Sequence, residues 1–182
     1  MSPVYIERIL GIDPGFGRVG YGVIEQTNPS AKDSMRRSDR EWKEVCHGCI
    51  TTSPKDSFVA RLKNLHAALI GLIKEYKPTR MAVEEIFYFK NAKTVIEVAQ
   101  ARGVIILTAV EHNLPVDEFT PLQVKQAMTG YGRAEKEQMQ KIVAMILGVK
   151  GKIKSDDAAD ALAVALTAGQ SLWVKNIKTR EH

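Results

Sequence analysis

The chain has 182 residues, 45% of them hydrophobic, which is typical of a single globular domain with a sizeable core. No apolar run has the length of a membrane span, and the N-terminus lacks a basic-then-apolar leader, so we expect a cytoplasmic protein. The net charge of +5 is carried almost entirely by residues 121–154. Such one-sided charge favours a polyanionic partner such as nucleic acid, although a solvated helical surface gives the same pattern.

The first predicted element is a β-hairpin. GIDPGFGRVGYG at residues 11–22 matches the G-x-G-x-x-G pattern of a dinucleotide-binding loop, but that loop must open a helix. Here Val19, Tyr21 and Val23 alternate with glycines, which predicts a second strand, and the turn begins at Asp13. We therefore interpret the cofactor match as accidental. The glycines instead let something large approach the backbone beside Asp13.

The remaining elements follow in an order typical of an α/β fold. Residues 27–43 are polar and serine-rich and predict a long flexible loop, and residues 171–182 predict a loosely ordered tail. Periodicity predicts strands at 6–12, 19–24, 44–52, 80–84 and 115–119, and helices at 58–76, 92–112, 122–128, 134–147 and 155–170. We expect one domain over residues 1–182: a mixed five-stranded sheet, with a three-strand antiparallel meander, two parallel strands and helices on both faces.

Two cysteines, Cys46 and Cys49, have the spacing of half a zinc site. The histidines show no spacing that supplies the other two ligands. If the segment is a strand, residues three apart point to opposite faces and cannot share a metal. We expect two reduced thiols, although a turn at Gly48 would keep the metal or redox alternative open.

Carboxylates stand at the ends of two predicted strands. Asp13 ends the first strand and Glu84 the fourth, so their side chains converge if the strands are neighbours. Asp-Pro-Gly is also an ordinary turn starter, which gives Asp13 a purely structural explanation. Glu84 is harder to explain in this way because it closes the apolar run 81–83, where an unpaired carboxylate is costly.

The last predicted helix supplies two more carboxylates. Asp157 and Asp160 are three apart and share one helical face. Asp156 and Asp157 lie in the first turn, where acids favour the helix dipole, and Ser155 can cap the helix. Asp160 lies a turn deeper among alanines, where that explanation weakens. An aspartate facing a packed interface needs a counter-charge.

A cation resolves the crowding of these four acids. Carboxylates from two strand ends and one helix form an oxygen-only site suited to Mg²⁺ or Mn²⁺. Two such ions about 4 Å apart activate water and stabilise the leaving oxygen in phosphodiester cleavage. The sequence therefore predicts a catalytic metal site made by Asp13, Glu84, Asp157 and Asp160.

The same residues resemble the RuvC family of Holliday-junction resolvases, in the RNase H-like superfamily. The resemblance covers nearly the whole chain and is carried by five segments: GIDPG, AVEEIFYFKNAKT, QARGVI, QVKQAMTGYGRAEKEQM and DDAADALAVAL. It implies the same four catalytic and metal-binding acids. It also implies a C₂ homodimer that nicks opposing strands of four-way junction DNA symmetrically and leaves 5′-phosphate ends. The sequence leaves open whether a branch-migration motor complex delivers the junction.

Five residues are candidates for contact with DNA. The resemblance assigns Lys125 and Lys136 to DNA contact or catalytic support, and Phe87 to stacking near the branch point. Lys90 follows the aromatic run 87–89, an arrangement suited to unstacked bases, and Arg133 belongs to the basic segment. Packing in the core remains the better interpretation for at least one of the three aromatic residues.

Three other protein classes share part of this pattern. The actin and sugar-kinase ATPases share a GID-type first strand, but they require two large lobes and a second phosphate loop. A related ribosomal-RNA-processing nuclease of the same superfamily fits VEEIFYFKNA and DAADALA less well. A catalytically inactive module that binds branched DNA is disfavoured by the complete set of four acids. The segment 27–43 looks longer than is usual in the family, as either a DNA-contacting arm or inert disorder.

Overall fold

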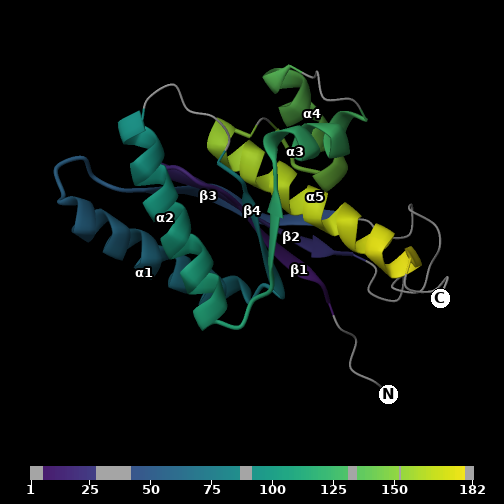
Figure 1. The fold of residues 1–182 in the computed structure, drawn as a ribbon. Coiled ribbons are helices and arrows are strands. Elements are labelled where there is room, and N and C mark those ends of the chain that lie inside the picture. The colour runs from purple at the N-terminus through teal and green to yellow at the C-terminus, as the bar shows by residue number, and fades with distance from the viewer. Residues whose placement is uncertain (1–5, 28–41, 87–91, 131–134, 152, 179–182) are drawn as a thin grey trace.

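A five-stranded mixed sheet forms the centre of the molecule (Figure 1). The computed structural model describes residues 6–27, 42–86, 92–130, 135–151 and 153–178. The strands are β1 (Arg8–Asp13), β2 (Arg18–Gln26), β3 (Trp42–Thr51), β4 (Arg80–Glu84) and β5 (Val116–Phe119), in the spatial order β3-β2-β1-β4-β5. The first three form an antiparallel meander, whereas β4 and β5 run parallel to β1. The predicted sheet is confirmed.

Helices cover both faces of this sheet. The five are α1 (Phe58–Tyr76), α2 (Ala92–Glu111), α3 (Pro121–Thr129), α4 (Lys136–Leu147) and α5 (Asp156–Lys178). On one face α1 and α2 pack over a core that includes Leu10, Leu69 and Ile105. On the other face α5 lies against the sheet, with α3 and α4 packed on it (Figure 1). The two cores are thus separated by the sheet itself.

Local signals explain the ends of several helices. The Ser57 side chain accepts a hydrogen bond from the Ala60 amide at the start of α1. After Tyr76, Lys77 caps the end of α1 in a left-handed conformation, before Pro78. A capping box between Thr120 and Gln123 starts α3. The capping box places α3 directly after β5, at the sheet edge where the parallel strands end.

The glycines of the first hairpin make room for α5. A Cβ atom at Gly11 or Gly20 would overlap a backbone carbonyl oxygen of α5, that of Ala161 or Asp157 respectively. A Cβ at Gly22 would overlap the Leu162 side chain. Because side chains alternate along a strand, the valines of β2 point to the opposite face. The predicted close approach is confirmed, and β2 follows the hairpin turn where a dinucleotide loop requires a helix.

Several boundaries differ from the sequence prediction. Strand β1 begins at Arg8 and β2 ends at Gln26, each two residues beyond the predicted position, and two further differences have a physical cause. Strand β3 begins at Trp42, two residues before the predicted start, because Trp42 pairs with Gln26 and its indole packs against Gly169 of α5. The predicted loop 27–43 is therefore shorter at its end, and residues 28–41 lie outside the described residues. Helix α5 continues to Lys178 through the predicted loose tail, since no glycine or proline interrupts it after Gly169. None of the described helices is long and apolar enough to cross a bilayer.

Candidate active site

Asp13 and Glu84 meet at one end of the sheet because β1 and β4 are parallel neighbours. Ile12 pairs with Val83, so the next residue of each strand reaches the same edge. Burial raises the pKa of Asp13 to about 8, helped by the negative charges of Glu84, Asp160 and Asp157. The predicted convergence of the two strand ends is confirmed.

The two strand carboxylates share a proton. Burial raises the pKa of Glu84, and the charge of Asp160 adds to that rise. A hydrogen bond between the two side chains raises the pKa of Asp13 and lowers that of Glu84, so protonated Asp13 donates to the Glu84 carboxylate. A proton held between two buried carboxyl groups lowers their mutual repulsion.

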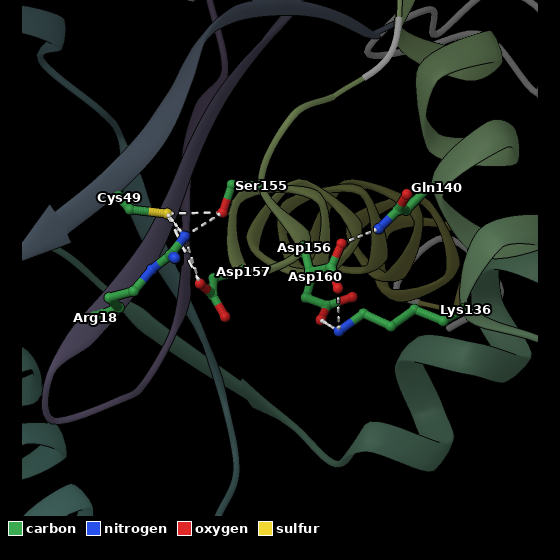
Figure 2. Close-up of polar contacts among 8 residues, drawn as sticks. All are labelled: Arg18, Cys49, Lys136, Gln140, Ser155, Asp156, Asp157 and Asp160. Atoms are coloured by element: carbon green, nitrogen blue, oxygen red, sulfur yellow. Dashed lines mark hydrogen bonds and ion pairs between the residues drawn. The ribbon is translucent and has the colours of Figure 1, made fainter.

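Asp157, in the first turn of α5, is held by Arg18. The Arg18 Nη2 atom lies 3.0 Å from Asp157 Oδ2 and donates to Ser155 Oγ at 2.9 Å and to Cys49 Sγ at 3.5 Å (Figure 2). Cys49 and Ser155 also hydrogen-bond each other, with 3.0 Å between Sγ and Oγ. The start of β2, the strand β3 and the start of α5 therefore meet around this aspartate.

Asp160, one turn further along α5, is held by Lys136. The Lys136 Nζ atom lies 3.4 Å from Asp160 Oδ2 and 3.3 Å from Asp156 Oδ2 (Figure 2). Burial raises the pKa of Asp160, and the ammonium of Lys136 opposes that rise. The two helix aspartates thus each have a cationic partner.

A pocket of about 220 Å³ opens beside these groups. Glu84 and Asp160 line it, together with Lys125 of α3 and Lys136 of α4. Both lysines lower the pKa of Glu84 through their charge. Val124 and Met139 supply an apolar wall, so the carboxylates and ammonium groups of the pocket lie beside apolar side chains. Such a pocket can bind a phosphate while its carboxylates hold cations.

The acids form two pairs at this edge of the sheet. Asp13 is within electrostatic reach of Glu84, Asp160 and Asp157. Within the described part of the chain, however, three or more Asp, Glu, His or Cys side chains are nowhere gathered at metal-binding distances. The donors are all oxygens, and burial raises the pKa of three of the acids, with neighbouring carboxylates adding to each rise. This chemistry fits a hard divalent cation.

Other site predictions have mixed outcomes. Lys125 and Lys136 line the pocket, and their contact with DNA stays a prediction, whereas Phe87, Lys90 and Arg133 lie outside the described residues. Arg18 and Gln140 were not predicted. Their partners are distant in the sequence, so no local pattern marks them.

The cysteines behave as their strand position requires. Cys46 packs on the side of α1, where burial raises the pKa of its thiol, and Cys49 points to the opposite face beside Ser155. Both are free thiols. The strand geometry on which the prediction depended, with the two thiols on opposite faces, is confirmed.

Comparisons with known proteins identify the family of the chain. A family model described as crossover junction endodeoxyribonuclease RuvC matches residues 9–168. Relatives of that name from Caldicellulosiruptor saccharolyticus and Petrotoga mobilis are 48% and 47% identical over 159 and 161 residues. Those alignments cover 87% and 88% of this chain and 90% and 92% of the relatives.

A solved structure has the same fold. The Thermus thermophilus RuvC in complex with Holliday junction substrate aligns with a TM-score of 0.82 and 30% identity, covering 93% of this chain and 97% of that one. The family match spans all four predicted acids and nearly the whole sheet. The chain belongs to the RuvC family of crossover junction endodeoxyribonucleases.

Proposed function

We propose that this protein is a structure-specific DNA endonuclease that resolves four-way (Holliday) junctions in recombination and repair. One observation carries the proposal: a buried pair of carboxylates at the end of two parallel strands lies beside a pocket lined by two lysines, in a chain of the RuvC family. The carboxylates supply the cation-binding chemistry of hydrolysis, and the lysines supply attraction for the phosphate backbone.

RuvC nucleases are metal-dependent, and Mg²⁺ is the ion proposed here. Asp13, Glu84, Asp157 and Asp160 would hold it, two ions in each site, with Mn²⁺ as a substitute. When bound, the ions activate water and stabilise the departing oxygen, which leaves a 5′-phosphate and a 3′-hydroxyl. Arg18 keeps the Asp157 carboxylate beside the site through its ion pair.

The pocket lysines would contact the DNA backbone. Lys125 and Lys136 project from different helices into the pocket, so they can approach one phosphate from two sides. Phe87, Lys90 and Arg133 remain predicted contacts, with Phe87 stacking on a base near the branch point.

A homodimer is proposed from the outer face of α2. Val98, Ala101 and Ile105 are buried against the sheet, so the helix presents a second apolar stripe outward. On that stripe Ile96, Leu107 and Val110 are 60%, 55% and 60% exposed. A two-fold axis along α2 would bury the stripe and give two sites for two nicks.

Sedimentation tests the dimer. The wild-type protein should sediment as a dimer at micromolar concentration, and Leu107→Glu should shift it towards monomer. Val59→Glu, at a 73% exposed apolar position on α1, is the control and should leave the dimer intact. A wild-type protein that is monomeric throughout this range would contradict the proposed dimer.

Two further parts of the proposal concern the cell. Access to chromosomal junctions requires a cytoplasmic location in a bacterium. A branch-migration motor complex that brings junctions to the dimer is the proposed macromolecular partner. Co-sedimentation of the protein with such a motor on a four-way junction tests the second point.

A junction-cleavage assay tests the function. Purified protein with Mg²⁺ should place paired nicks at symmetry-related positions in a synthetic four-way junction, with ligatable ends. A linear duplex of the same sequence is the control and should remain intact. Binding without nicks at every Mg²⁺ and Mn²⁺ concentration would favour a passive junction-binding module. Preferential cutting of structured RNA would favour an RNA-processing nuclease of the same superfamily.

A further inference from the structure

Asp156 makes contacts that a residue serving only the helix dipole does not need. It stands at the first position of α5, where a carboxylate is favourable in any helix. Its side chain is 62% exposed, yet both carboxylate oxygens have partners on α4. Oδ2 lies 3.3 Å from Lys136 Nζ, and Oδ1 accepts a hydrogen bond of 2.7 Å from Gln140 Nε2 (Figure 2).

These contacts join α4 to α5, and we call the group of Lys136, Gln140, Asp156 and Asp160 the bracket. Lys136 and Gln140 are four residues apart on α4, and Asp156 and Asp160 are four apart on α5, so each pair shares one face of its helix. Gln140 fixes Asp156, and Asp156 then shares the Lys136 ammonium with Asp160. Lysine has a long flexible stem, so a second anchor restricts where its charge lies.

We propose that Asp156, held by Gln140, is a positioning residue that keeps the Lys136 ammonium at the wall of the catalytic pocket without committing it to Asp160 alone. The inference rests on the proposed nuclease function. An ammonium shared between two carboxylates neutralises Asp160 less than an exclusive ion pair does. The ammonium would also keep Asp156 as an ion-pair partner if the Asp160 carboxylate bound a divalent cation.

The inference predicts a specific defect when the Asp156 charge is removed. In Asp156→Asn, Lys136 has Asp160 as its only carboxylate partner in the bracket, so it competes more strongly with a divalent cation for that group. We expect the half-saturating Mg²⁺ concentration for junction cleavage to rise about twofold to fivefold, the range of one partly exposed ion pair. Mn²⁺ binding to the DNA-free protein, measured by calorimetry, should weaken by a similar factor.

Controls separate positioning from helix stability. Asp156→Glu keeps the charge and should restore most of the wild-type Mg²⁺ midpoint. Glu137→Gln removes a first-turn carboxylate of α4 that lines a different pocket, and should leave the midpoint unchanged. A dipole role alone predicts a lower melting temperature for Asp156→Asn with wild-type Mg²⁺ and Mn²⁺ midpoints, and that result would overturn the inference.

A double-mutant cycle tests the route through Lys136. If Asp156 acts through Lys136, Asp156→Asn should have no further effect on the Mn²⁺ affinity of a Lys136→Met protein. Fully additive effects would contradict the inference. A wild-type protein that cuts junctions while Asp156→Asn shows unchanged metal midpoints rejects only the role of Asp156. A wild-type protein that never cuts rejects the proposed function, whereas the Mn²⁺ titrations still report on the bracket.

Discussion

The two pairs of acids at this site are held in different ways. Asp13 and Glu84 are placed by the backbone, because the parallel register of β1 and β4 brings their strand ends together. Asp157 and Asp160 are placed by helix packing and by ion pairs with Arg18 and Lys136. The strand pair offsets its repulsion with a shared proton, whereas the helix pair uses cationic side chains.

This difference separates a fixed half of the site from an adjustable half. Strand register cannot change without moving the core, since a shift of one residue turns every side chain to the other face. Side-chain ion pairs at a partly exposed surface contribute little to the free energy of folding, so their geometry can change at low cost. Changes in the strand pair should therefore affect cleavage most, and changes around the helix pair should tune it.

The largest expected effect comes from Asp13→Asn. The change removes one predicted metal ligand from the fixed half and should reduce cleavage by about 1,000-fold or more. Junction affinity should be kept or improved, because one negative charge facing the phosphates is lost. Cleavage rates and gel-shift affinities measured on the same junction check both parts. Asp56→Asn, in the turn before α1, is the control for a general aspartate effect, and loss of junction binding in Asp13→Asn would contradict its role.

Gly20→Ala should disturb the relation between the two halves. The added methyl would overlap the Asp157 carbonyl and push the start of α5 off the sheet. We expect a loss of about 1 to 3 kcal/mol in the free energy of unfolding, with reduced cleavage. Denaturant melts and cleavage rates measure both effects.

Gly71→Ala is the matched control. Gly71 lies within α1 and has no atom within 4 Å of a built Cβ, so alanine there should stabilise by up to about 1 kcal/mol. A Gly20→Ala protein that is as stable and active as Gly71→Ala would show that α5 does not depend on this close approach.

The strand pair should also give stability a distinctive pH dependence. The pKa of Asp13 is about 8 in the folded protein and near 3.8 ordinarily, so the folded state binds more protons between these values. Its contribution to stability is therefore largest at low pH and declines as pH rises towards 8. Asp13→Asn should remove that decline and gain on the order of 1 to 3 kcal/mol over wild type near pH 8.5, since one pKa unit is about 1.4 kcal/mol. Urea melts from pH 5 to 9 in chelator measure this, and parallel curves for the two proteins would contradict the shared proton.

The smallest expected effect concerns the helix pair and its cation. Lys136→Ala should weaken junction binding and reduce the slope of log affinity against log salt by about one unit, as for the loss of one phosphate contact. Lys63→Ala, on α1 at the opposite face of the sheet, should leave the slope unchanged. Equal slopes for wild type and Lys136→Ala would show that Lys136 forms ion pairs with Asp156 and Asp160 but does not contact a DNA phosphate.

The sequence was sufficient for the parts of the fold that depend on short periodic patterns. Alternation in β2 predicted both the hairpin and a glycine face, and α5 occupies that face. Strand ends located Asp13 and Glu84 because parallel neighbours end at one edge. The start of β3 was missed because Trp42 is fixed by packing on Gly169, which is remote in sequence.

The contacts around Asp157 and Asp160 could not be predicted because they too join residues that are distant in the sequence. Arg18 reaches Ser155 across 137 positions of sequence, and Gln140 reaches Asp156 across a loop between two helices. Nothing in the residues near Arg18 or Gln140 indicates these partners. Asp156 was assigned to the helix dipole, and its partners on α4 become visible only when the helices are packed.

The sheet has a consequence for how this protein can change over evolution. The apolar stripe of α2 and the carboxylates of α5 lie on opposite faces, with one layer of strands between them. If α2 pairs two subunits as proposed, substitutions on the outer stripe can alter that pairing without touching any side chain at the pocket. Assembly and chemistry can thus be selected independently, as long as the strands that both share keep their small residues.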